Sequence, residues 1–223
     1  MEQEEVIKFL KKNGKVKNVL GMARFGIQPK TEVCGVSAVQ LSQLAKKIGA
    51  DHELAQNLFW SNVHECRCLA ARIDDPLKIT SNQMDKWAED FDSWDVCDSA
   101  CMHLFRYSPL AIKKCFKWAK EKDEYYKRAS FALMAALASD KKNLLDDKQF
   151  EQFFPIIIET SNDERNYVKK AVNWALRQIG KRNEALRQKS MKIAETIIKL
   201  NTPSARFIGG DALRELKAKG KIK

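Results

Sequence analysis

Residues 164–179, "ERNYVKKAVNWALRQI", indicate the fold class of this 223-residue chain. The apolar side chains recur every three or four residues, a spacing that places them on one face of an α-helix. Trp174 points about 130° away from the centre of that face, since each helical residue turns by about 100°. The segment is therefore predicted to be an amphipathic helix with an indole ring off its buried face. That face would consist of Val168, Ala171, Val172, Ala175, Leu176 and Ile179.

The same periodicity runs through the rest of the chain, and the alternation typical of β-strands is nearly absent. Ser37, Asp51, Thr80 and Ser93 are suited to helix N-caps, and Pro109 to the first turn of a helix. Helices are expected at residues 2–13, 37–48, 51–61, 63–73, 80–90, 93–106, 109–121, 123–139, 147–159, 164–179, 182–200 and 204–218.

The length and order of these helices predict an all-α fold. Pairs of helices recur about every 30 to 45 residues, which is typical of an α-solenoid built from HEAT-like helical hairpins. Such a stack curves, and here we expect its concave face to be basic. No long Gly-, Ser- or Pro-rich linker divides the chain, so residues 1–223 are predicted to form a single domain. A compact irregular helical bundle is the structural alternative.

Composition indicates a soluble globular protein, with 44% hydrophobic and 31% charged residues. No apolar run approaches the roughly 20 residues that a membrane span needs, so no membrane partner is expected. The chain starts with acidic residues where a signal peptide has basic ones, and we therefore expect a cytoplasmic protein. The six cysteines are expected to be free thiols that mostly fill the core.

The net charge of +11 is unevenly distributed. Residues 1–111 contain 14 Lys and Arg against 15 Asp and Glu, whereas residues 112–223 contain 26 against 14. Clustered Lys and Arg favour a polyanionic partner such as nucleic acid, because phosphate contacts release counterions. A lysine-rich solvated surface is the alternative.

The stretch "SWDVCD" at residues 93–98 places Trp94 and Asp98 four residues apart, and hence on one face of a helix. Asp98 is predicted to lie well away from the buried face, with Trp94 at its edge. The alternative is a half-buried core tryptophan beside an ordinary solvated acid. The predicted buried set is Val96, Cys97, Ala100 and Leu104.

Two further helices carry candidate binding residues. Lys170 and Arg177 flank Trp174, and Tyr167 lies on the same side, a combination suited to a sugar, base or phosphate. A neighbouring helix covering this face is the alternative.

In "EYYKRASFALMAALA", Arg128 is expected above Ala132 and Ala135, whose small side chains would leave room for a phosphate at the guanidinium. A salt bridge to a neighbouring helix is the alternative.

Other chemistry has little support. His64, Glu65, Cys66 and Cys68 resemble a zinc deaminase only superficially, because the P-C-x-x-C segment is absent, so no metal or cofactor is predicted. His64 is interpreted as an interhelical contact.

Several of these motifs together resemble the DNA alkylation repair family of HEAT-like-repeat glycosylases, the AlkD-like proteins. They are "SWDVCD", Arg128 in "YYKRAS", "DERNYVKKAVNWALRQIGKRN", "ARFGI" at 23–27 and "LFWSNVHECRCLA" at 58–70. The resemblance covers most of the chain. It departs from the family at Ser93, where members often have a second bulky residue.

The resemblance implies a monofunctional DNA glycosylase that releases cationic N3- and N7-alkylated purines, such as 3-methyladenine and 7-methylguanine, from duplex DNA. It implies that Trp94, Asp98, Arg128 and Trp174 are the catalytic positions, and that the enzyme acts on stacked duplex from its concave face. We expect Lys127, Tyr167, Lys169, Lys170 and Arg177 to contact DNA, and a monomer associated with the nucleoid when it acts. A HEAT-like module that binds DNA or a protein without catalysis is the alternative.

Overall fold

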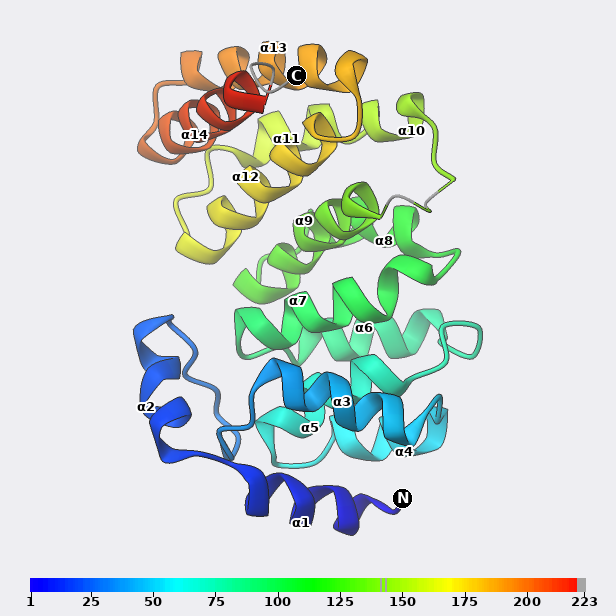
Figure 1. Ribbon diagram of the computed structural model, residues 1–223. Helices are drawn as coiled ribbons and strands as arrows, with labels where there is room; N and C mark the ends of the chain where they lie inside the picture. Colours follow the sequence, from blue (N-terminus) through cyan, green and yellow to red (C-terminus); the bar gives the residue numbers. More distant parts are fainter. Residues whose placement is uncertain (141, 143, 220–223) are drawn as a thin grey trace. The chain divides into compact units, whose positions relative to one another are not determined.

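The computed structural model describes residues 1–140, 142 and 144–219, which fold into α-helices (Figure 1). The described residues include no β-strand, and only an isolated bridge pairs Glu32 with Val63. The all-α prediction is confirmed. The helices are α1 (Gln3–Asn13), α2 (Val16–Arg24), α3 (Ala38–Ile48), α4 (His52–Phe59), α5 (His64–Ile73), α6 (Ser81–Glu89), α7 (Trp94–His103), the 3₁₀ helix η1 (Phe105–Tyr107), α8 (Ala111–Trp118), α9 (Glu124–Ser139), α10 (Asp147–Glu151), α11 (Phe154–Thr160), α12 (Asn166–Gly180), α13 (Glu184–Lys199) and α14 (Pro203–Lys219).

The chain forms two compact units, Met1–Pro109 and Leu110–Lys223. Leu110 and Ala111 are uncharged, so the first unit has 14 basic and 15 acidic residues and the second has 26 and 14. The net positive charge of the chain therefore belongs to the second unit. The prediction of one continuous domain stays a prediction.

Helix starts follow the expected capping chemistry at three of the four proposed N-caps. The side chains of Ser37, Asp51 and Thr80 each accept a hydrogen bond from the backbone N–H three residues later. Ser93 precedes α7 as predicted, but its hydroxyl makes no cap bond to a backbone N–H. Pro109 lies two residues before α8 begins, so its placement in the first turn was wrong.

The first unit is built around α5, against which α3, α4 and α7 pack. The rings of Phe59 and Trp87 stack in its core, with centroids 3.9 Å apart. The buried Glu65 carboxylate accepts the backbone N–H groups of residues 34, 35 and 36 at 2.9, 2.5 and 3.2 Å. These bonds satisfy a buried charge and join the segment after α2 to α5.

The second unit is built around α9, whose residues 128–138 are all buried. Helices α8 and α12 pack against α9, and α13 pairs with α14 (Figure 1). Gly209 permits a close approach of that pair, because a Cβ there would lie 2.5 Å from both the Ala194 carbonyl oxygen and Ile198 Cγ1. A Cβ on the adjacent Gly210 would meet no atom within 4 Å.

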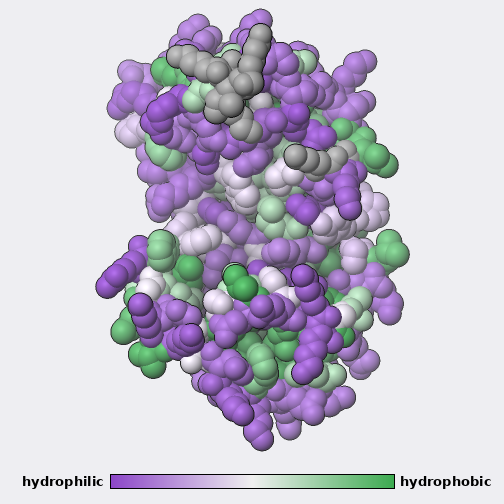
Figure 2. Space-filling model, in the orientation of Figure 1, coloured by the Kyte–Doolittle hydropathy of each residue, from purple (hydrophilic) through white to green (hydrophobic). Residues whose placement is uncertain are grey.

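The cysteines are placed as the sequence predicts, and the visible surface is mostly hydrophilic. Figure 2 shows mostly hydrophilic residues on the visible face, with hydrophobic residues scattered among them. None of the described helices is long and apolar enough to cross a membrane. All six cysteines are free thiols, and all except Cys34 are buried.

Candidate functional site

Helix α7 carries Trp94 and Asp98, and its predicted buried face is confirmed. The predicted inward residues Val96, Cys97 and Ala100 are at most 1% exposed, as is Leu104 directly after the helix. Trp94 and Asp98 are only half-buried, so both lie off the fully buried face. The indole Nε1 of Trp94 donates a hydrogen bond to the carbonyl oxygen of Phe25 at 3.0 Å. One edge of this indole is thereby held by the segment that follows α2.

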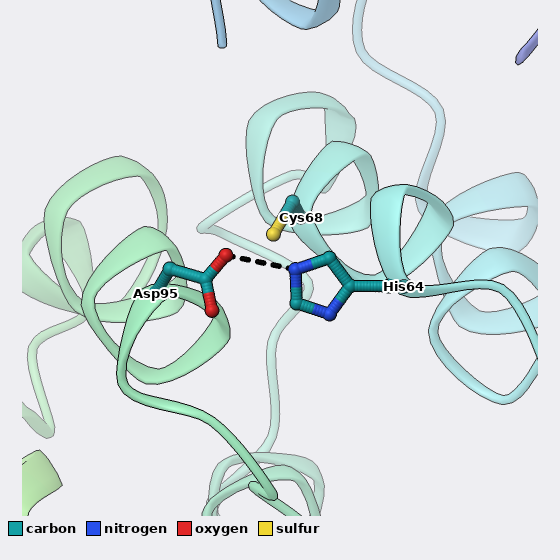
Figure 3. Close-up of side chains that lie close together, drawn as sticks. All are labelled: His64, Cys68 and Asp95. Atoms are coloured by element: carbon teal, nitrogen blue, oxygen red, sulfur yellow. Dashed lines mark hydrogen bonds and ion pairs between the residues drawn. The ribbon is translucent and has the colours of Figure 1, made fainter. Parts of the chain in front are cut away.

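His64, the first residue of α5, binds Asp95 of α7 (Figure 3). Their Nε2 and Oδ2 atoms are 2.8 Å apart, and the side chains are 2% and 22% exposed. Burial lowers the pKa of His64, but hydrogen bonds with Asp95 and Cys68 outweigh it and raise the pKa to about 10. Burial raises the pKa of Asp95, but the bond to His64 outweighs it and holds that pKa below its usual value. The pair is thus an imidazolium and a carboxylate, and the predicted interhelical contact is confirmed.

Cys68 lies one turn after His64, and its Sγ, His64 Nε2 and an Asp95 carboxylate oxygen lie within 4.8 Å of one another (Figure 3). These donor types suit zinc, but two ligands about 2.0 Å from a tetrahedral ion are about 3.3 Å apart, more than the 2.8 Å observed. The Arg72 guanidinium also lies close to this cluster, where its Nη1 donates to the Cys68 carbonyl oxygen at 2.5 Å. A positive charge there disfavours a second cation. His64 Nδ1, which would orient a zinc-bound imidazole, has no hydrogen-bond partner among the described residues. The geometry is that of a buried ion pair.

Helix α12 presents Trp174 as the sequence predicts. All six residues of its predicted apolar stripe are fully buried, whereas Trp174 is half-buried and Lys170 is exposed. Lys169 is half-buried. Asn173 beside the indole is buried, and its Nδ2 donates to the Ile208 carbonyl oxygen at 3.0 Å. This bond joins α12 to α14 and fixes the helix that carries the tryptophan.

The prediction that Arg128 stands over an open alanine patch was wrong. Arg128 is 6% exposed, and Ala132 and Ala135 are fully buried. The reason is that neighbouring helices cover α9 all round. Arg128 Nη1 donates to the carbonyl oxygen of Tyr167 at 2.8 Å, so the guanidinium joins α9 to the first turn of α12. A catalytic role for Arg128 stays a prediction.

Tyr167 is joined to α9 by two further contacts. Its ring stacks on Tyr125, with centroids 5.3 Å apart, and its backbone N–H donates to Glu124 Oε1 at 3.0 Å. Burial raises the pKa of Tyr125, and the neighbouring Tyr167 and Glu124 act in the same direction. The N-terminal ends of α9 and α12 are therefore tightly connected through tyrosine, arginine and glutamate side chains.

Two of the predicted DNA-binding cations have acidic partners within the second unit. Arg177 binds Glu215 through Nη1, and its Nε lies 3.6 Å from Asp211 Oδ2. Lys127 Nζ lies 3.7 Å from Asp163 Oδ2. A phosphate would have to compete with these carboxylates, so Arg177 and Lys127 are weaker candidates than the exposed Lys170.

The four predicted catalytic residues are divided between the two units. Trp94 and Asp98 belong to the first unit, where they share α7. Arg128 and Trp174 belong to the second, on the packed helices α9 and α12. Trp94 and Asp98 therefore lie one turn apart on one helix, whereas Arg128 contacts α12 at Tyr167, two turns before Trp174.

Sequence reasoning missed α2 as a helix and as a candidate binding element. No residue of α2, all of which the structure describes, is buried. Val16 and Leu20 are 76% and 69% exposed, and Phe25, directly after the helix, is 73% exposed. Two signals were available: Val16, Val19, Leu20 and Ala23 recur at helical spacing, and residues 6–31 contain seven Lys and Arg and no Asp or Glu. Exposed apolar groups among cations are unusual unless a partner covers them.

A family model described as "DNA alkylation repair enzyme" matches residues 6–218. No curated protein matches the chain. One solved structure belongs to "a new family of proteins related to the HEAT-like repeat DNA glycosylases with affinity for branched DNA structures"; it is 22% identical and covers 88% of this chain and 83% of its own, with a TM-score of 0.77. A designed armadillo repeat protein covers 79% of this chain and 90% of its own at 17% identity, with a TM-score of 0.37. The first likeness confirms the predicted fold of HEAT-like helical repeats. With nearly its whole length matched by the family model, the chain belongs to the DNA alkylation repair enzyme family.

Proposed function

We propose that this protein is a monofunctional DNA glycosylase that excises cationic N3- and N7-alkylated purines from duplex DNA. The observation that carries the proposal is the pairing of Trp94 and Asp98, half-buried and one turn apart on α7, in a member of the DNA alkylation repair family. A carboxylate and an indole face both attract positive charge, so these two groups would stabilise a positively charged nucleoside.

The proposed reaction needs no general acid. An N3- or N7-alkylated purine carries a positive charge and leaves as a neutral base when its glycosidic bond breaks. The remaining sugar develops oxocarbenium character, and the Asp98 carboxylate would oppose that charge and orient the attacking water. Because the sugar becomes positive only as the bond breaks, this attraction favours the transition state over the bound substrate.

The second unit would supply DNA binding. Its excess of basic residues favours the phosphate backbone, and exposed Lys170 is suited to a direct phosphate contact. Trp174, on the same helix as Lys170, would add an indole face to this DNA-binding surface. The Arg128 guanidinium is buried and donates to the backbone carbonyl oxygen of Tyr167. Arg128 would therefore act indirectly, by holding the first turn of α12 in place.

Release of free base from defined duplexes tests the proposal. The protein is incubated with duplex DNA containing one 7-methylguanine, and free base is quantified by mass spectrometry. Release should be catalytic for 7-methylguanine and 3-methyladenine, and close to background for uracil and hypoxanthine, whose bases are neutral. The Asp98→Asn variant is the control for a contaminating glycosylase. Equal rates on uracil would contradict the mechanism.

A second candidate function is binding of branched DNA without catalysis. The exposed apolar and basic surface of α2 and Phe25 favours it, because unpaired or unstacked bases offer apolar faces beside phosphates. The structurally similar protein with affinity for branched DNA motivates the choice of ligand. In a mobility-shift assay this function predicts tighter binding of a four-way junction than of a duplex of equal length, with no base release from either.

A further inference from the structure

We infer that His64 is a positioning residue, whose ion pair with Asp95 fixes the start of α7 and thereby the directions of Trp94 and Asp98. The inference rests on the proposed function for its catalytic consequence. It goes beyond that function by assigning a role to a pair that is not among the predicted catalytic or DNA-contacting residues.

The start of α7 lacks the usual source of helix-end stability. The hydroxyl of Ser93, the N-cap residue, donates to Asp95 Oδ1 at 2.8 Å instead of accepting a first-turn N–H. A first turn without an N-cap side chain depends on other acceptors for its N–H groups, and the Asp95 carboxylate supplies one by accepting a backbone N–H. Trp94 is the first residue of this turn, so any fraying would move its indole directly. Asp95 follows it, where a carboxylate also interacts favourably with the helix dipole.

The partner of Asp95 is on the most buried helix of the first unit. All residues of α5 except Arg72 are buried, and the backbone N–H of His64 donates to the Glu32 carbonyl oxygen at 2.8 Å. His64 therefore has little freedom, and its imidazolium holds Asp95 at a fixed point. This geometry connects the start of α7 to the buried start of α5.

A second connection between the same helices fixes the rotation of α7. Arg72 of α5 donates to Ser99 Oγ of α7, and Ser99 Oγ donates to the Cys68 carbonyl oxygen at 3.1 Å. Asp95 and Ser99 are four residues apart, so both connections lie on one side of α7. Two fixed points on one side of a helix determine where its other side chains point. The outward direction of Trp94 and Asp98 follows from them.

The test compares His64→Gln with a matched control, His52→Gln. Half-buried His52 also pairs with a carboxylate, its Nδ1 2.6 Å from Oδ1 of buried Asp74, but that pair joins α4 to the end of α5. Both variants place a neutral amide where an imidazole contacts a carboxylate. Thermal unfolding and circular dichroism establish that both fold. The control therefore separates loss of a histidine–carboxylate pair from loss of positioning at α7.

The first measurement is hydrogen exchange of the Trp94 indole N–H by ¹⁵N NMR. The chain has five tryptophans, and Trp94→Phe identifies the signal. The hydrogen bond to the Phe25 carbonyl oxygen should protect this proton in the parent, and exchange should be faster in His64→Gln but not in His52→Gln. The second measurement is single-turnover base release, which should fall about 10- to 100-fold in His64→Gln only. Affinity for DNA should stay within about twofold.

A double variant tests whether the contact itself is responsible. His64→Gln with Asp95→Asn forms a neutral amide pair that can restore the hydrogen bond, so release and indole protection should recover in part. Unchanged exchange and release in His64→Gln would overturn the inference, as would equal losses in His52→Gln. If the parent releases no base, the proposed function fails, and indole exchange alone then decides whether His64 positions Trp94.

Discussion

Replacing Asp98 by Asn removes one charge from the candidate site and leaves its shape unchanged. The carboxylate is half-buried, so an effective dielectric constant of about 20 to 40 applies to its attraction for a developing positive charge. At about 5 Å from the sugar this attraction is about 2 to 3 kcal/mol. Its loss should slow single-turnover base release by roughly 30- to 150-fold. Binding of lesion DNA should be equal or tighter, because a negative charge near phosphates is removed.

The assay measures release of 7-methylguanine with enzyme in excess, together with the dissociation constant for the same duplex. The melting temperature should change little, since a polar substitution outside the core costs about 1 kcal/mol or less. Trp94→Ala provides a comparison, and it should slow release while also weakening binding. Release at the parental rate by Asp98→Asn would refute the electrostatic role and favour the non-catalytic function.

Three further predictions concern stability and binding. Gly209→Ala should lower the free energy of unfolding by about 1 to 3 kcal/mol because its Cβ has no room, whereas Gly210→Ala should be neutral or slightly stabilising in urea unfolding. Lys170→Ala should reduce the salt dependence of duplex binding by close to one unit of slope, and Arg177→Ala by less, because Arg177 already has two acidic partners; equal effects would contradict this. The pKa of His64 is raised to about 10 from about 6.5, so its stabilising contribution is complete below about pH 6.5 and is lost as the pH rises toward 10. Between pH 7 and 9.5 the melting temperature of the parent should therefore fall more steeply than that of His64→Gln.

The sequence was sufficient where a helix has one buried face. The stripe of α12 and the inward residues of α7 follow directly from a period of 3.6 residues. The same helical spacing was present in α2, where Val16, Val19, Leu20 and Ala23 recur every three or four residues, but this nine-residue segment was not recognised as a helix. Sequence reasoning also merged α10 and α11 into one helix, although Pro155, in the first turn of α11, cannot occupy the interior of a continuous helix.

The environment of Arg128 could not be predicted from its own helix. Alanines beside an arginine are compatible with an open surface or with a close neighbouring helix, and periodicity does not distinguish the two. The structure has the second arrangement, with α12 supplying the Tyr167 carbonyl oxygen. For His64 the sequence indicated an interhelical contact but not its partner, because Asp95 is 31 residues away and meets it only through the packing of α5 on α7.

The separation of charge between the two units also determines how the protein would meet DNA in solution. At physiological salt the field of a charge decays over about 8 Å, and only a cluster of one sign acts beyond that distance. The second unit has such an excess, whereas the first has nearly equal numbers of acidic and basic residues. In the proposed reaction the second unit would make the first contact with DNA, whatever the base sequence. The weakly bound protein would then slide along intact duplex. Asp98 is on the unit that contributes least to this attraction, so its negative charge would hardly slow the search for a lesion.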